Sequence, residues 1–164
     1  MDIPYRPIAL ILLIGVSSGI VFQRAQAGGG RYFPPVNDAV VKAECGSCHL
    51  AFPASMLPAS SWTRMMADLG HHFGDDASVD PATAEKITRY LTENAADTGG
   101  QRYGRKLLRG TSTRDAPLRI TELPRWVREH HEISAAEWKS KKVGSKANCL
   151  ACHADAERGY FEDD

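Results

Sequence analysis

In the first part of the chain, apolar residues recur at the spacing of α-helices. Helices are predicted over 36–44, 60–69 and 81–97, where apolar side chains return every three or four positions. Polar residues that favour N-caps precede the first and the third of them. In the first helix the expected cap is Asn37 or Asp38, and the apolar face contains Val40, Val41 and Cys45. The apolar face of the second contains Trp62, Met65, Met66 and Leu69. In the third, Asp80 is the expected cap and the apolar face contains Ala84, Ile87, Leu91 and Ala95.

The chain after residue 98 is less periodic. The basic stretch 99–117 is interpreted as a linker, and 118–124 is expected to be extended. A helical segment is predicted over 125–133, and a capping box at 134–137 starts another helix. The tail, 160–164, is expected to be frayed. Since no region is rich in the alternation typical of strands, the predicted fold class is mainly α with much irregular structure.

The first 27 residues have the features of a secretory signal peptide. Arg6 supplies a positive start, an apolar run covers 8–22, and Ala25-Gln26-Ala27 places small residues around a cleavage site. The run of about 15 residues is short for a membrane-spanning helix, which needs ~20, but an uncleaved anchor is the alternative. Both interpretations export the chain, so the expected location is the periplasm.

The balance of charges excludes one large class of function. The chain has 20 basic and 20 acidic residues, and its formal net charge is zero. Nucleic-acid-binding domains are usually strongly basic, so no nucleic-acid partner is expected. The basic residues of the linker region either form a solvated strap or bind anionic groups of a cofactor or an acidic redox partner. They are Arg102, Arg105, Lys106, Arg109, Arg114 and Arg119.

Two copies of one motif use all four cysteines. Cys45-Gly46-Ser47-Cys48-His49 and Cys149-Leu150-Ala151-Cys152-His153 both fit Cys-x-x-Cys-His, the attachment site of a c-type haem. In such a site the thiols bond to the porphyrin and the histidine binds the iron. A four-cysteine zinc site is the alternative, which the histidines and the export signal disfavour. The sequence therefore predicts two covalently attached haem c groups, held by Cys45, Cys48, Cys149 and Cys152, with His49 and His153 as proximal ligands.

A chain of this length has few residues to cover two porphyrins, so each haem is expected to form much of the core around it. The predicted division is a signal peptide at 1–27, a first haem-binding lobe at 28–98, the linker at 99–117 and a second haem-binding lobe at 118–164. We expect a monomer that is largely unfolded without haem.

The sixth ligand of each iron is expected to be a second histidine. The remaining histidines form two adjacent pairs, His71 with His72 and His130 with His131. Neighbouring residues on a helix point about 100° apart, so one member of each pair should face the iron. Methionine is the other common ligand, but Met56, Met65 and Met66 all precede the second half. Met65 and Met66 also share the apolar stripe of the second helix, which favours a packing role.

Four further segments resemble the small bacterial dihaem cytochrome c family known as DHC. The resemblance covers roughly 41–161, and its His-Phe-Gly and Ile-Thr-Glu-Leu-Pro stretches are fairly specific. The segments are Met56-Leu57-Pro58-Ala59-Ser60-Ser61-Trp62, His72-Phe73-Gly74-Asp75-Asp76-Ala77, Leu118-Arg119-Ile120-Thr121-Glu122-Leu123-Pro124 and Asn148-Cys149-Leu150-Ala151-Cys152-His153.

The resemblance implies a periplasmic electron carrier with two bis-histidine, low-potential haems in two lobes of cytochrome c type. It assigns the distal ligands to His72, before Phe-Gly, and to His130, after Arg-Glu, which leaves His71 and His131 as their neighbours. The partners it implies are redox proteins, namely an oxygen-binding monohaem cytochrome and a membrane cytochrome b. No enzyme activity and no small-molecule substrate are expected. The alternatives are a peroxidase-like dihaem enzyme and a gas-binding cytochrome with one open haem.

Overall fold

The computed structural model describes residues 31–162, apart from the side chain of Thr113. The predicted signal peptide, 1–27, lies outside the described residues. Within the described part of the chain, no helix combines the length and the apolar character needed to span a membrane.

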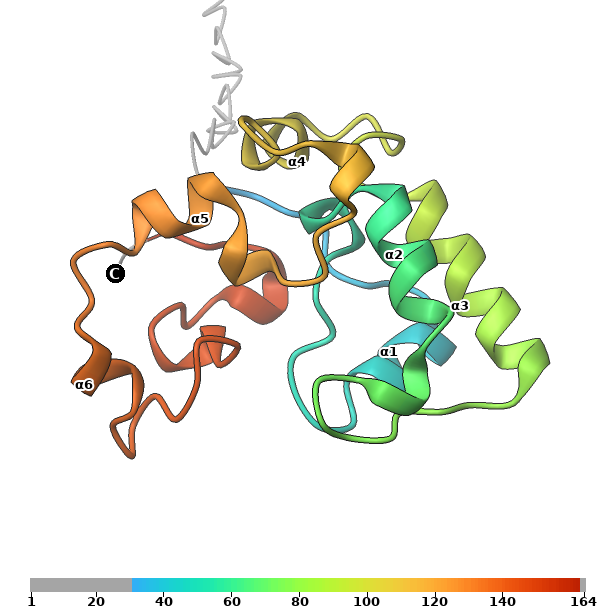
Figure 1. Ribbon diagram of the computed structural model, residues 1–164, viewed down its shortest axis with the longest axis horizontal. Coiled ribbons are helices and arrows are strands. Elements are labelled where there is room, and N and C mark those ends of the chain that lie inside the picture. Colours follow the sequence, from blue (N-terminus) through green and yellow to red (C-terminus); the bar gives the residue numbers. More distant parts are fainter. Residues whose placement is uncertain (1–30, 163–164) are drawn as a thin grey trace, which may run out of the picture.

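The described residues form short helices joined by irregular segments, with α1–α3 on one side, α5 and α6 on the other and α4 above them (Figure 1). Between 31 and 162, β-pairing is limited to isolated bridges. The predicted class, mainly α with much irregular structure, is thereby confirmed. The α-helices are α1 (Ala39–Cys45), α2 (Ala59–Met66), α3 (Pro81–Glu93), α4 (Arg102–Leu107), α5 (Pro124–Glu129) and α6 (Ala135–Trp138). The 3-10 turns are η1 (Ala54–Met56), η2 (Leu69–His71), η3 (Thr113–Asp115), η4 (Ile120–Glu122), η5 (Cys149–Ala151) and η6 (Ala156–Arg158).

Side chains cap three of the helices at the positions that the sequence indicated. The Asp38 carboxylate accepts hydrogen bonds from the first backbone N–H groups of α1, and Asp80 does the same for α3. Ser134 accepts the Glu137 N–H at 3.2 Å at the start of α6. Each bond satisfies a donor that the helix itself leaves unpaired, which is worth about 0.5–2 kcal/mol.

The core of the first half lies between α2, α3 and the end of α1. Trp62 of α2 is buried against Ile87 and Leu91 of α3, and Val41 of α1 is buried completely. The Trp62 indole N–H donates to the Ala54 carbonyl at 2.8 Å, so burial of the ring leaves no unpaired donor. These are the apolar stripes of the predicted helices, and α1, which ends at the first cysteine of the first motif, packs on α3.

The segment 99–117, expected to be an irregular linker, contains a helix. Gly104 and Leu107 of α4 are buried, and α4 packs on η1. A Cβ atom on Gly104 would lie 2.5 Å from the Ser55 carbonyl oxygen and 3.0 Å from the Cα of Ala96. The close approach of α4 to η1 therefore requires glycine at position 104. The pattern of apolar residues in the sequence does not predict this contact, because glycine contributes no apolar side chain.

Three expectations for the second half were wrong in part. The segment 118–124 is not extended throughout, because η4 lies within it, and the helix predicted over 125–133 ends at Glu129. The expected frayed tail begins with ordered residues: Tyr160 forms a β-bridge with Tyr32, and Phe161 is buried. The chain's end is ordered by pairing with residues near position 31, whereas η4 is closed by the local hydrogen bond from the Leu123 N–H to the Ile120 carbonyl.

The start and the end of the described chain are paired. The Phe33 N–H donates to the Gly159 carbonyl at 2.8 Å, and the Phe161 N–H donates to the Arg31 carbonyl at 3.1 Å. Phe33 and Phe161 also meet edge to face, with ring centroids 5.6 Å apart. Residues 31–33 thus contact the second half before the chain enters α1, as Figure 1 shows. The lobe boundaries at 98 and 118 stay predictions.

We expect Gly104→Ala to destabilise the protein by about 1–3 kcal/mol, because the new methyl group would overlap the backbone of η1. Gly70→Ala is the matched control, since a Cβ there would lie 3.6 Å from its nearest neighbour, Ser78 Oγ. The control should have a stability close to that of the wild type. Denaturant unfolding of the haem-loaded proteins measures both, and equal midpoints for the two variants would contradict the close packing of α4.

Candidate functional site

The first Cys-x-x-Cys-His motif begins at the end of α1. Cys45 is the last residue of the helix, and Gly46 caps it by donating its N–H to the Lys42 carbonyl at 3.1 Å. Cys48 and His49 follow on an exposed turn. Nδ1 of His49 lies 2.8 Å from the Leu50 carbonyl oxygen, to which it donates in the Nδ1–H tautomer. That tautomer leaves Nε2 free to bind a metal.

The second motif is formed by η5 and the residues after it. Cys149 is half-buried, and desolvation raises the pKa of its thiol to about 11, whereas Cys152 is exposed. His153 is buried, and its Nδ1 lies 2.9 Å from the Glu162 carbonyl oxygen, which again leaves Nε2 for a metal. All four cysteines are free thiols, as covalent attachment of two haems requires.

A tight turn positions His72. The Asp75 N–H donates to the His72 carbonyl at 3.1 Å, and the two residues between them have positive φ angles, 56° for Phe73 and 114° for Gly74. Glycine adopts such angles readily, so Gly74 allows the chain to reverse here. The turn explains why the His-Phe-Gly sequence is distinctive.

The two members of the first histidine pair point to different surroundings. His71 is 85% exposed and bonds to Asp68 at 2.7 Å, and this bond raises the pKa of His71. His72 is half-buried, and desolvation followed by the nearby His49 lowers its pKa. A lowered pKa favours the neutral imidazole, which is the form that binds metals.

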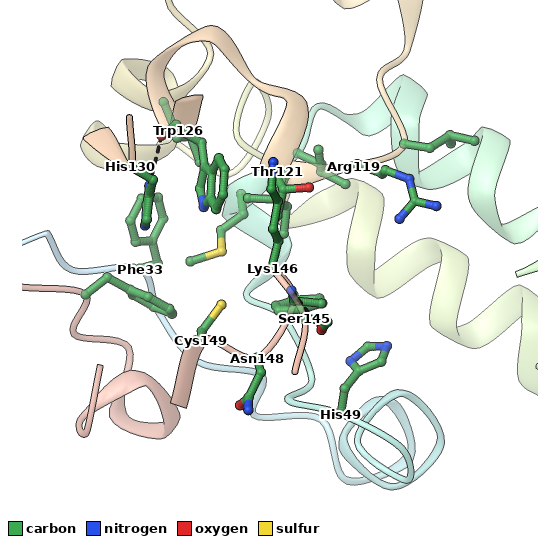
Figure 2. A pocket seen from close by; sticks show the side chains of 18 of the residues that line it. Phe33, His49, Arg119, Thr121, Trp126, His130, Ser145, Lys146, Asn148 and Cys149 are labelled. Atoms are coloured by element: carbon green, nitrogen blue, oxygen red, sulfur yellow. Dashed lines mark hydrogen bonds between the residues drawn. The ribbon is translucent and has the colours of Figure 1, made fainter. Parts of the chain in front are cut away.

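His130 occupies the position just after α5. The Trp126 carbonyl accepts both the His130 backbone N–H, at 3.1 Å, and its Nδ1–H, at 2.9 Å (Figure 2). The indole of Trp126 stacks on the His130 ring, with centroids 4.1 Å apart and planes 13° apart. His131, by contrast, is 67% exposed, and its Nδ1 bonds to the Arg128 carbonyl.

The ring separations fit one metal ion between the histidines of each site. The ring centroids are 6.2 Å apart for His49 and His72 and 6.1 Å apart for His130 and His153. An imidazole nitrogen binds a transition metal at about 2.0–2.1 Å and lies about 1.1 Å from its own ring centre, so two rings on opposite sides of a metal have centroids about 6.3 Å apart.

The methionines do not occupy these positions. Met56 lies in η1 and is buried in the core, while Met65 and Met66 are half-buried against it. Among the described residues, the histidine ring beside His49 is that of His72, and the histidine ring beside His153 is that of His130.

One cavity of about 720 Å³ connects the two pairs and is lined mainly by apolar and aromatic side chains. All four facing histidines line it, together with Cys45, Cys149 and Cys152. In Figure 2, His49 and His130 enter from opposite sides, with Cys149 between them. A second groove has both Cys48 and Cys149 in its walls, so the two motifs also lie close together. The residues present therefore fit two haem groups, each of which would be held by one Cys-x-x-Cys-His motif.

Four cationic side chains also line this cavity: Arg31, Arg119, Arg125 and Lys146. Arg119 lies over the Phe73 ring, with its guanidinium carbon 4.0 Å from the centroid, and forms an ion pair with Glu122 at 3.5 Å. Lys146 lies 5.7 Å from the Trp126 ring centroid. These cations could pair with haem propionates.

Sequence reasoning missed Trp126, Lys146 and the Glu162 carbonyl. A histidine four residues after a tryptophan on a helix was the available signal for Trp126, because residues at that spacing are neighbours. The Glu162 carbonyl carried no signal, since only the tertiary fold brings the end of the chain to His153.

The profile of the dihaem cytochrome c family matches residues 41–161. Among solved structures, a dihaem cytochrome c from Rhodobacter sphaeroides is 50% identical, with a TM-score of 0.70, and the match covers 78% of this chain and 99% of that one. A dihaem cytochrome c from Shewanella baltica OS155 is 39% identical, with a TM-score of 0.61, and the match covers 76% of this chain and 86% of that one. Among proteins with curated functions, none matches significantly.

Replacing Cys45 and Cys48 with Ala should remove one covalent haem and leave the other, because each motif attaches its own group. Intact-mass measurement of the exported protein should give the polypeptide plus two haems for the wild type and plus one for the variant. The Cys149→Ala/Cys152→Ala variant is the reciprocal control. A wild type that carries zinc and no haem iron would contradict this assignment.

Proposed function

This chain belongs to the dihaem cytochrome c family, and we propose that it is a periplasmic electron carrier with two bis-histidine haems. His49 and His72 bind one iron, and His153 and His130 bind the other. The single observation that carries this proposal is the separation of the rings, 6.2 and 6.1 Å, which suits one metal ion in each pair. The family's two c-type haems supply the ferric–ferrous couple.

The chain's own groups hold each imidazole ready for the metal. The carbonyls of Leu50, Trp126 and Glu162 bond to Nδ1 of His49, His130 and His153, which fixes the ring and directs Nε2 away from the carbonyl. A ligand held in place does not need to move when the charge on the metal changes. Imidazole in place of methionine thioether also lowers the potential, so both haems are expected to have low potentials.

Two imidazoles saturate an iron, and a saturated iron offers no position to peroxide or dioxygen. A carrier function is therefore favoured over a peroxidase-like enzyme or a gas-binding cytochrome with one open haem. The shared cavity supports the same role, because side chains of both sites line it and electrons would have a short path between the haems.

The proposed location is the periplasm, where the predicted signal peptide would direct the chain. The proposed partners are a membrane cytochrome b, as electron donor, and an oxygen-binding monohaem cytochrome, as acceptor. The α4 surface, defined here as Arg102 and Arg105 of the helix and Arg109 just after it, is the proposed docking site for an acidic partner. These residues are exposed, and desolvation followed by repulsion from Arg102 and Arg109 lowers the pKa of Lys106. Positive charge is thus concentrated beside Leu107, which lines the haem cavity.

His72→Ala and His130→Ala should each convert one haem from low spin to high spin and allow it to bind carbon monoxide, because each removes one axial ligand. Optical spectra of the reduced proteins, with and without carbon monoxide, measure both effects.

His71→Ala and His131→Ala are the matched controls, since these exposed neighbours face away from the paired rings. Both should keep two low-spin haems that do not respond to carbon monoxide. If the controls open an iron and His72→Ala and His130→Ala do not, the assignment is wrong by one residue. Carbon monoxide binding by the wild type would instead favour the open-haem alternative.

Changing Arg102, Arg105 and Arg109 to Glu should slow electron transfer to an acidic monohaem cytochrome about tenfold at low ionic strength, because complementary charge steers the encounter. The difference should shrink with added salt, which screens exposed charges beyond ~8 Å at physiological ionic strength. Stopped-flow reduction of the partner measures both.

The control changes Lys139, Lys141 and Lys142 to Glu, three exposed residues outside α4. It alters the net charge by the same amount and should affect the rate less. Equal effects would show that net charge alone matters and that the α4 surface is not the docking site.

A further inference from the structure

The two pairs of facing histidines differ in the angle between their rings. The planes of His49 and His72 lie 20° apart, whereas those of His130 and His153 lie 85° apart. Because the centroid separations agree within 0.1 Å, 6.2 against 6.1 Å, the pairs differ in rotation and not in distance. One site therefore has nearly parallel imidazoles, and the other has crossed ones.

Contacts with Trp126 hold the His130 ring in its crossed position. The indole lies face to face with the imidazole, 4.1 Å away and 13° from parallel, and the Trp126 carbonyl bonds to Nδ1. A rotation of the ring toward the plane of His153 would tilt it out of this stack. Trp126 also contacts Trp138, with ring centroids 5.6 Å apart, and Lys146, whose Nζ lies 5.7 Å from its ring centroid. Trp138 contacts His130 less directly, at 6.1 Å and 41°.

The first site has no equivalent constraint on its distal ligand. His72 is followed by Phe73, whose ring is tilted by 60° to it, and the stacked aromatic residue there is Phe52, which lies against the proximal His49 at 4.9 Å and 26°. A planar partner therefore supports the proximal ring in the first site and the distal ring in the second.

We propose that Trp126 is a positioning residue that holds His130 crosswise to His153, and thereby gives the two haems different ligand fields. This inference rests on the bis-histidine ligation proposed above. An imidazole donates π-electron density to the iron d orbital perpendicular to its ring. Two parallel rings act on the same d orbital, so its energy separates from that of the second d orbital available for π bonding. Crossed rings act on one orbital each and leave the two nearly equal in energy.

Electron paramagnetic resonance of the ferric protein distinguishes these cases. The wild type should give two low-spin signals of equal spin count, a rhombic three-line spectrum and a strongly anisotropic signal with one large g value. The Cys45→Ala/Cys48→Ala variant, which keeps only the second haem, should give the anisotropic signal alone. Two rhombic signals would overturn the inference and leave bis-histidine ligation standing. A high-spin ferric signal in the wild type would instead refute the ligation.

Trp126→Leu tests the role of the indole, because it removes the stacked face and keeps the backbone carbonyl that bonds to His130. The expected result is loss of the anisotropic signal and gain of a second rhombic one, with both haems still attached and low spin. Trp126→Phe restores a planar face and should recover the anisotropic signal. Trp138→Leu removes a neighbouring tryptophan but keeps the indole that stacks on His130, so this variant should retain the anisotropic signal.

Trp126→Met provides a second disruptive variant, since its flexible chain fills the space without a planar face. A low-spin, haem-loaded Leu or Met variant with the wild-type spectrum would overturn the role of Trp126. Failure of both to take up the second haem, with Trp126→Phe loading normally, would also overturn it, because the indole would then be needed for assembly and not for orientation.

Discussion

The proposed function depends on two pairs of imidazoles whose ring centroids lie 6.2 and 6.1 Å apart, the separation that one iron ion between two rings requires. Each proximal histidine directly follows the cysteines that anchor the porphyrin. The local sequence is therefore enough to bring it close to the iron. The proposed distal histidines are 23 residues away in sequence, since His72 follows His49 and His130 precedes His153 by that number. Their position must come from the fold.

The two sites meet this requirement by different local means. In the first, a reversal of the chain through positive φ angles at Phe73 and Gly74 presents His72. In the second, the end of α5 presents His130, and the carbonyl and indole of Trp126 hold its ring. A turn and a helix end therefore lead to nearly the same ring separation, with different freedom for the ring to rotate. Two chemically identical histidine pairs therefore differ in the angle between their rings, 20° against 85°.

The halves of the molecule are joined by contacts that also serve the sites. Pairing of 31–33 with 159–161 places Phe33 against Phe161, which in turn lies 5.8 Å from the His153 ring. Arg119 reaches from the second half to Phe73, the residue after His72. These contacts cross between the halves, and side chains of both Cys-x-x-Cys-His motifs line one cavity.

The sequence by itself determined the chemistry and much of the first half of the fold. Cys-x-x-Cys-His is a local motif, so it identifies the cofactor without reference to distant residues, and the stripes of Trp62, Ile87 and Leu91 predicted the helices that they form. Only the tertiary structure decided the orientation of the ligand rings, the helix in the supposed linker and the order of the chain's end. These depend on a glycine that allows close packing, on backbone carbonyls and on pairing between residues more than a hundred positions apart. Hydrogen bonds between backbone groups leave no periodic pattern in a sequence, because every residue except proline carries the same N–H and C=O groups. A close contact that requires a glycine leaves none either, because glycine has no side chain to form a pattern.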